Sequence, residues 1–238
     1  MGFVKAPYEL AALRSHVGAD LVEQVGRALR ELAAKGVADR GVVALLEAVE
    51  AARAEVPRPS LVWTGPEVQG LHARGTREVF DELIGRATSS LWISTFAYFD
   101  GKTAFQVLAE RMDAVRSLSV KLMLNIHYHP DSPGPEDSVS RARWMLWEKN
   151  WPGLRRPDVY YFPESLVEDR SQTAVLHAKA IVRDEEEVLV TSANFTDAAL
   201  SRNIELGVLL HDAPFARTVV RHYQRLIESG RLLALGRD

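Results

Sequence analysis

From residue 61 onward, short runs of apolar, β-branched and aromatic residues alternate with longer stretches whose apolar residues recur at helical spacing. The runs predicted to be strands are 61–63, 91–99, 119–126, 158–162, 174–183, 187–192 and 203–210. The stretches predicted to be helices are 76–87, 104–115, 140–150 and 213–230. Regular alternation of strands and helices predicts a layered α/β domain.

The first 56 residues follow a different pattern, because they carry helical signals alone. Two amphipathic helices are predicted, over 20–36 and 41–56, and each needs a surface on which to pack. Pro57 and Pro59 then stop the second helix and stiffen the connection. We therefore predict a helical subdomain over 1–56 and an α/β domain over 61–238.

Composition narrows the classes of chemistry. The 238 residues include no cysteine, which excludes disulfides, zinc–thiolate sites and thiol nucleophiles. The first residues lack the apolar core of a signal peptide, and no apolar run is long enough to span a bilayer. The expected location is the cytoplasm, without stable membrane insertion. A net charge of -3 gives no global attraction to nucleic acid, so any polyanion site depends on local basic groups.

Polar groups with regular spacing interrupt the strand-like segments after residue 174. His177 and Lys179 are two residues apart, and so are Ser192 and Asn194. Residues two apart on a strand share a face, so a hairpin would bring all four side chains together. Lys179 and Asn194 would then bind the oxygens of a tetrahedral anion such as a phosphodiester. A neutral His177 could attack its phosphorus.

The spacing H-x-K-x4-D from His177 to Asp184, with Ser192 and Asn194 beyond it, resembles the signature of the phospholipase D superfamily. The later segment "SRNIELGV" is similar to the part of that family that carries a downstream Asn and Glu. Residues 61–228 resemble one whole repeat of the fold, which implies a mixed β-sheet flanked by helices. One departure is Thr191, where the family usually has glycine. A finer resemblance, carried by "LVWTGP", "RGTREVFDELI" and residues 177–209, is to the phospholipase D-like component of the bacterial DISARM anti-phage systems.

The resemblance implies a role for each matching residue. His177 would be the nucleophile that forms a phosphohistidine, and Lys179 and Asn194 would bind phosphate with help from Ser192. Glu205 would accept a hydrogen bond from the second ring nitrogen of a histidine and so fix its tautomer. Asp184 and Asn203 would be structural members of the motif. This chemistry needs no metal and no cofactor.

A two-step reaction of this type needs two histidines, one to attack and one to protonate the leaving oxygen. Family members with two signatures supply both in one chain, whereas this sequence has one signature. We therefore expect a homodimer that pairs His177 with its symmetry mate, with the active site at the interface.

Three groups of residues outside the motif leave alternatives open. His127 and His129 are either a metal pair or rim residues of a loop. The tryptophans 144, 147 and 151 are either a base-stacking platform or a packed helix face. A set of basic residues is either a phosphate-binding patch or a solvated surface: Arg141, Arg143, Lys149, Arg155 and Arg156. Glu185, Glu186 and Glu187 are interpreted as a solvent-exposed turn, and His222 as a structural residue.

The function expected from these features is a metal-independent phosphodiesterase that acts on nucleic acid, in bacterial defence and with protein partners from that system. Nucleic acid is favoured over lipid because the sequence has neither a basic amphipathic helix nor an apolar anchor. A phospholipase or transphosphatidylase is the alternative enzyme. A non-catalytic phosphate-binding subunit, docked through residues 1–56, is the alternative from another class.

Overall fold

A computed structural model of the chain describes residues 10–14, 17–18, 20–55, 58–67, 69–70, 72–97, 101–128, 134–167, 171 and 173–236. The chain divides into two compact units, Met1–Pro57 and Arg58–Asp238. Each unit has its own packing and is described by itself.

The first unit is helical where it is described. It contains α1 (Leu10–Leu13), α2 (Val22–Ala34) and α3 (Arg40–Glu55). Leu13, Val22 and Val42 form the centre of a small apolar cluster. Gly36, with φ of +84°, follows α2 in the left-handed conformation that ends many helices.

The second unit is built on one mixed sheet. In the described residues, nine strands are hydrogen-bonded in the order β2-β1-β8-β7-β6-β3-β4-β5-β9. Their bounds are β1 Ser60–Thr64, β2 Arg74–Gly75, β3 Ser90–Thr95, β4 Ser119–Leu124, β5 Asp158–Tyr161, β6 Ala180–Arg183, β7 Glu187–Thr191, β8 Glu205–Leu210 and β9 Leu233–Ala234. The pairs β1–β2, β3–β4 and β4–β5 are parallel, and the others are antiparallel.

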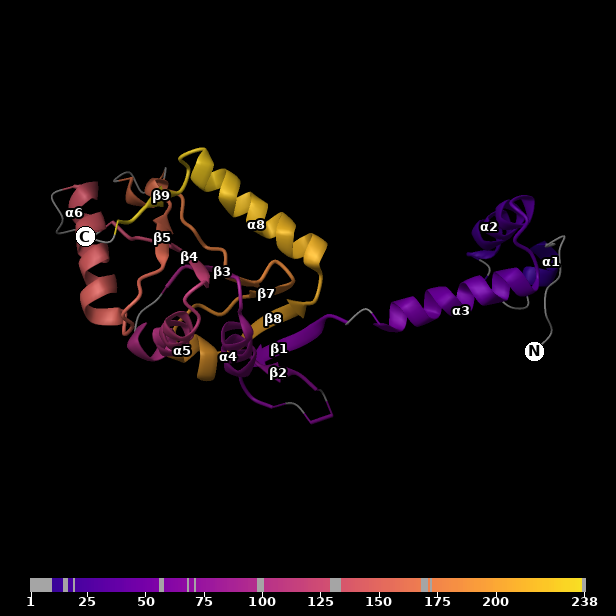
Figure 1. Cartoon of the computed structure of the whole chain (residues 1–238), viewed down its shortest axis with the longest axis horizontal. Helices are drawn as coiled ribbons and strands as arrows, with labels where there is room; N and C mark the ends of the chain where they lie inside the picture. The colour runs from indigo at the N-terminus through magenta and orange to yellow at the C-terminus, as the bar shows by residue number, and fades with distance from the viewer. Residues whose placement is uncertain are drawn as a thin grey trace. The chain divides into compact units, whose positions relative to one another are not determined.

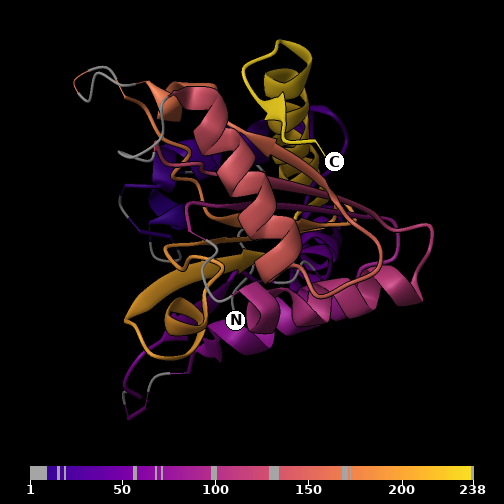
Figure 2. The same cartoon turned by 90° about the vertical axis from the view of Figure 1, so that its left-hand side faces the viewer.

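Helices cover both faces of this sheet, which makes three layers (Figure 1). On one face α4 (Thr76–Arg86) and α5 (Gly101–Ala114) pack over the larger apolar core. On the other face α8 (Ala213–Glu228) packs over a second cluster. The turned view shows the strands between α8 and these two helices, with α6 (Pro135–Trp144) in front (Figure 2). The predicted α/β class, a mixed sheet flanked by helices, is confirmed.

Several short elements complete the unit. The predicted helix over 140–150 begins at Pro135 and ends in a π-helical turn, Met145–Asn150. A 3-10 turn covers Pro163–Leu166, and the short helix α7 covers Asp197–Ser201. The strand predicted over 174–183 was too long, because β6 begins at Ala180.

The pairing places the ends of six strands side by side. The edge of the sheet that they form runs across the strands and not along an outermost strand. Because β1, β3, β4 and β7 run in one direction and β6 and β8 in the other, their carboxyl and amino ends meet there. His177 and Lys179 precede β6, Ser192 and Asn194 follow β7, and Glu205 begins β8. The sheet therefore brings these five residues of the predicted site to a single edge.

Candidate active site

Lys179 lies in the extended segment that enters β6, and its ammonium group is in contact with His177. The Nζ atom donates to the His177 carbonyl oxygen at 2.9 Å and lies 3.0 Å from both ring nitrogens. The Lys179 carbonyl accepts from the N–H of Thr191 at 3.1 Å, which continues the β6–β7 pairing by one residue. The histidine is exposed, whereas Lys179 is only 9% exposed.

The surroundings of Lys179 are unusual for a lysine. Burial lowers the pKa of Lys179 below its ordinary value, and the carboxylate of Glu205 partly offsets this. The ring of Phe96 lies 5.6 Å from Nζ and packs against the His177 ring, with 4.8 Å between centroids. A cation that has lost much of its hydration is a strong binder of anions, because an anion replaces the missing water. The sequence placed Phe96 inside the strand predicted over 91–99 and gave no sign of a place at the site, whereas β3 ends at Thr95.

Glu205 is held by two neighbours. Ser192 Oγ donates to Glu205 Oε2 at 2.5 Å, and Asn203 Nδ2 donates to Glu205 Oε1 at 3.3 Å. The N–H of Leu206 in turn donates to Ser192 Oγ at 3.1 Å. In the part of the chain that the structure describes, Glu205 makes no hydrogen bond to His177. Its role toward a histidine stays a prediction.

Asn194 is tied to the loop that follows β3. Its side-chain oxygen accepts from the N–H of Ala97 at 3.3 Å. The next residue, Phe195, donates its N–H to Thr95 Oγ1 at 2.9 Å, which fixes the backbone beside it. The contact with Ala97 leaves the two N–H donors of the Asn194 amide for other partners. A phosphate oxygen is a suitable acceptor for them.

Thr191 stands where the resemblance implies glycine, and its hydroxyl serves the backbone. Thr191 Oγ1 accepts from the N–H of Ala193 at 3.0 Å and donates to the carbonyl of Leu206 at 3.4 Å. The residue is 9% exposed. The side chain is thus occupied in supporting the turn that carries Ser192.

Asp184 lies at the far end of β6, away from the other motif residues, and anchors the start of β3. Its Oδ1 atom accepts from the N–H groups of Ser89 at 2.7 Å and Ser90 at 2.8 Å, and from Ser89 Oγ at 2.8 Å. Its Oδ2 atom accepts from the N–H and the hydroxyl of Thr88, both at 2.9 Å. These contacts join the β6–β7 turn to β3. They occupy both carboxylate oxygens of Asp184, so neither oxygen is left to bind a substrate.

The electrostatics of Asp184 follow from these bonds. Burial raises the pKa of Asp184, but hydrogen bonds from the backbone of Ser90, Ser89 and Thr88 outweigh burial and place that pKa well below its ordinary value. Asp184 and Glu185 have φ of +51° and +57°, a conformation in which a residue with a side chain is strained. The anchored carboxylate therefore also holds a strained turn in place.

The acidic turn is less exposed than the sequence indicated. Glu187 is only 4% exposed, and its carboxylate pairs with Arg183 Nε at 2.6 Å and His211 Nδ1 at 2.6 Å. Glu186 is exposed and contacts the same Arg183 guanidinium at 3.0 Å. The interpretation of all three glutamates as a solvated turn was wrong for Glu187, because a buried arginine requires its charge.

His127 lies beside the candidate site, whereas His129 falls outside the described residues. The His127 ring packs on Phe96 with 4.9 Å between centroids, and Asn125 Nδ2 lies 3.4 Å from its Nδ1 atom. Burial lowers the pKa of His127. In the described part of the chain, no group of three or more His, Asp or Glu side chains is placed to hold a metal ion.

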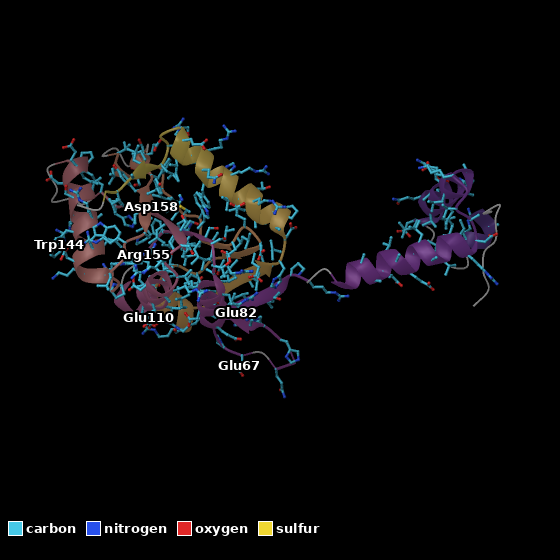
Figure 3. All side chains as sticks on the ribbon, in the orientation of Figure 1. Glu67, Glu82, Glu110, Trp144, Arg155 and Asp158 are labelled. Carbon is cyan, nitrogen blue, oxygen red and sulfur yellow. The ribbon has the colours of Figure 1, made fainter. Side chains whose placement is uncertain are left out.

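The tryptophans of the α6 region do not form one platform. Trp147 and Trp151 are each 7% exposed and belong to the core, whereas Trp144 is 51% exposed at the end of α6 (Figure 3). Lys149 lies over the Trp144 ring, 4.9 Å from its centroid. The packed-face interpretation therefore describes two of the three.

The basic residues nearby have structural partners of their own. Arg155 donates to the carbonyl groups of Met112 at 2.5 Å and Val115 at 3.1 Å, and so fastens the end of α5. Arg156 stacks on Trp147, 5.0 Å from the ring centroid. These contacts of Arg155 and Arg156 do not lie at the edge that carries His177. His222, which was expected to be structural, is exposed on α8 and lines a pocket together with His177.

A comparison with protein families identifies the family of the chain. The family model described as "Cardiolipin synthase, PLD-like domain" matches residues 80–227, more than half of the chain. No curated protein matches the chain significantly. In the described residues, no helix has the length and apolar character that crossing a membrane requires.

Solved structures give a second comparison. NucT from Helicobacter pylori is 16% identical with a TM-score of 0.51, and the match covers 74% of this chain and 98% of NucT. Nuc from Salmonella typhimurium, a phospholipase D family member, is 17% identical with a TM-score of 0.46 over 74% of this chain and 98% of its own. Phosphatidylserine synthase from Haemophilus influenzae is 16% identical with a TM-score of 0.46 over 74% of this chain and 39% of its own. The likeness to NucT shows a shared fold.

Proposed function

The chain belongs to the phospholipase D-like family, and from this premise we propose that it is a phosphodiesterase whose nucleophile is His177. The observation that carries the proposal is the contact between His177 and the buried ammonium of Lys179. A phosphodiester bound to Lys179 would have its phosphorus beside an exposed imidazole. Asn194 would donate to a second phosphate oxygen, and Ser192 would assist.

The proposed reaction has two steps. A ring nitrogen of His177 attacks phosphorus, the P–O bond to the leaving group breaks, and a second imidazole gives its proton to the leaving oxygen. Water then attacks the phosphohistidine and gives its proton to that second imidazole. The P–N bond breaks, which releases a phosphate monoester and restores His177.

The second imidazole is proposed to come from another copy of the chain. The sequence has one signature, and the other described histidines lack a neighbouring Lys and Asn in the motif's spacing. A two-fold axis at the edge of the sheet would bring both His177 rings to one phosphate. In such a dimer Glu205 would orient one of the two rings.

Nucleic acid is the proposed substrate class, and the finer resemblance supports a role in DISARM-type defence with partner proteins of that system. The family model's description names a cardiolipin synthase, which keeps phosphatidyl transfer as the second candidate. The two candidates share the phosphohistidine and differ in the group attached to phosphorus. A non-catalytic phosphate-binding subunit would bind the same anion without turnover.

The test compares substrates and variants in one assay. Single-stranded DNA, double-stranded DNA, RNA and phosphatidylglycerol vesicles are incubated with wild type, His177→Ala and, as a control on the exposed side of α8, Arg225→Ala, with and without EDTA. We expect cleavage of nucleic acid that EDTA leaves unchanged, loss of activity in His177→Ala, and full activity in Arg225→Ala. Quenching in an alkaline denaturant, which preserves the P–N bond, followed by peptide mass spectrometry should find a nucleotidyl group joined through phosphorus to the peptide that contains His177.

Each of the other outcomes would support a different site or function. Full activity in folded His177→Ala would refute the assigned nucleophile. Loss of activity in EDTA that a divalent ion restores would move the chemistry to the His127 region. Turnover of phosphatidylglycerol alone would select the lipid candidate. Binding of phosphodiesters without turnover under any condition would select the binding subunit.

A further inference from the structure

A cavity of about 820 Å³ adjoins the edge of the sheet that carries the candidate site. Leu61 and Trp63 of β1 and Leu206 of β8 form its apolar wall. The segment between β1 and β2 closes it with Gly65, Gln69 and His72 among others, and Glu67 of this segment is labelled in Figure 3. An apolar cavity of this size with a few polar groups is typical of a small-molecule or cofactor site.

The wall of this cavity is directly connected to the candidate active site. Leu206 and Trp63 are paired residues of β8 and β1. The N–H of Leu206 donates to Ser192 Oγ at 3.1 Å, and Ser192 donates to Glu205, the residue that precedes Leu206. Because β1 is three strands from β6, Trp63 lies about 14 Å along the edge from the strand that follows Lys179. A nucleic-acid strand whose scissile phosphate lies at the motif could therefore bring a base one or two nucleotides away to Trp63.

Trp63 is held in one orientation. Its indole Nε1 donates to the carbonyl of Pro66 at 3.2 Å. Gly65 has φ of +135°, and a β-carbon there would lie 3.2 Å from both Trp63 Nε1 and Ile204 Cγ1. Only glycine satisfies that backbone and that spacing. The half-buried indole is thus a fixed aromatic surface rather than a mobile side chain.

We infer that this cavity binds an unpaired nucleobase one or two nucleotides from the scissile phosphate, with the base stacked on Trp63. The inference rests on the proposed phosphodiesterase function and names its substrate more closely, as single-stranded nucleic acid. Every base has a flat face that stacks on an aromatic ring, and Gln69 and His72 supply hydrogen-bonding groups for its polar edge. A base inside a duplex is stacked between neighbours and cannot enter such a cavity.

Binding is measured in the His177→Ala background, in which cleavage does not disturb the equilibrium. The probes are a fluorescent oligothymidylate and the same oligonucleotide with abasic positions. Trp63→Ala should weaken binding of oligothymidylate by roughly 5- to 150-fold, the range for loss of one base–aromatic stack. It should leave binding of the abasic probe unchanged, and Trp63→Phe should recover much of the loss. Trp144→Ala, which removes an exposed tryptophan on α6, should change neither affinity.

Two results would overturn the inference. An equal loss of affinity for both probes in Trp63→Ala would show that Trp63 does not recognise a base. The Trp63→Ala variant could also change its oligomeric state and still bind oligothymidylate more tightly than the abasic probe. That result would show that a second copy of the chain covers the cavity. Failure of the proposed function is a separate outcome: wild type would then cleave no nucleic acid while base-dependent binding through Trp63 is still observed.

Discussion

Thr191 of β7 and Gly207 of β8 are paired across the sheet, and a β-carbon on Gly207 would lie 3.0 Å from the β-carbon of Thr191. The same β-carbon would lie 3.0 Å from the carbonyl oxygen of Val190. The absence of a side chain at Gly207 thus leaves the space that the Thr191 side chain occupies. Where the family resemblance implies glycine on β7, this chain has the small residue on the neighbouring strand instead.

This pairing predicts that the stability cost of Gly207→Ala depends on the residue at position 191. Gly207→Ala should lower the free energy of unfolding by about 1–3 kcal/mol, the usual cost of overpacking. In the Thr191→Gly background the same change should cost less, because the close contacts with the Thr191 side chain are gone, while the contact with Val190 remains. Urea unfolding of the four proteins measures the difference. Equal costs in both backgrounds would contradict the proposed complementarity.

Asp184→Asn should destabilise the fold by at least about 1.5–3 kcal/mol, the value of one hydrogen bond to a charged group. The two carboxylate oxygens of Asp184 face donors alone, and an asparagine would place its own N–H groups against those of Ser89 or Thr88. Thermal or urea unfolding at neutral pH checks this. Asp137→Asn, in the first turn of α6, is the control and should have little effect.

The same variant predicts a pH dependence. The folded-state pKa of Asp184 is depressed, so its carboxylate stabilises the fold above the unfolded pKa of about 4 and loses this effect as the pH falls below it. The difference in stability between wild type and Asp184→Asn should therefore be largest at neutral pH and shrink on acidification. A difference that stays constant down to pH 3 would disprove the role of the charge.

The lowered pKa of Lys179 should appear on the alkaline side of the activity profile. Because burial disfavours its charged form, kcat/KM should decline at a lower pH than the ordinary lysine value of about 10.4 implies. Glu205→Gln removes the carboxylate that raises this pKa, so the alkaline decline should move to still lower pH. An unchanged alkaline limb in Glu205→Gln would show that another group titrates there.

A dimer with one His177 should be nearly inactive if both imidazoles act on one phosphate. Wild type and His177→Ala chains with different tags are co-expressed, and the mixed dimer is purified through both tags. General acid–base assistance contributes about 10²–10⁴-fold, so the mixed dimer should lose activity by that order. A doubly tagged wild-type dimer controls for the tags. A mixed dimer with half of the wild-type rate, or a protein that is monomeric and active, would place the second acid within one subunit.

The layered α/β class and most helices could be predicted, because burial of one face imposes a period that the sequence displays. Residues such as Val79, Phe80, Leu83 and Ile84 gave α4 in this way, and all four are buried. The short elements α7 and β9 could not be predicted, because five residues and two residues are too few to show a period. The position of β9 depends on pairing with β5, which is distant in the sequence.

The candidate site was only partly readable from the sequence. Spacing identified His177, Lys179, Ser192 and Asn194 as a group, and the family resemblance added Glu205. The sheet brings the segments of all five to one edge. The spacing could not show that Ser192 and Asn203 hold Glu205, nor that Phe96 packs beside His177. Glu187 looked like a solvent residue because Arg183 and His211, which require its charge, are not marked by any local pattern.

The contacts of Asp184 explain why an aspartate five residues after Lys179 belongs to a signature of phosphate chemistry that it does not touch. The four residues between them, Ala180–Arg183, are the whole of β6. At about 3.3 Å per residue, five steps span about 16 Å, the distance from the edge that carries the lysine to the edge where β3 begins. The fixed spacing of the motif therefore corresponds to the length of β6. The strand is fastened at one end by the Asp184 carboxylate and carries the Lys179 ammonium at the other.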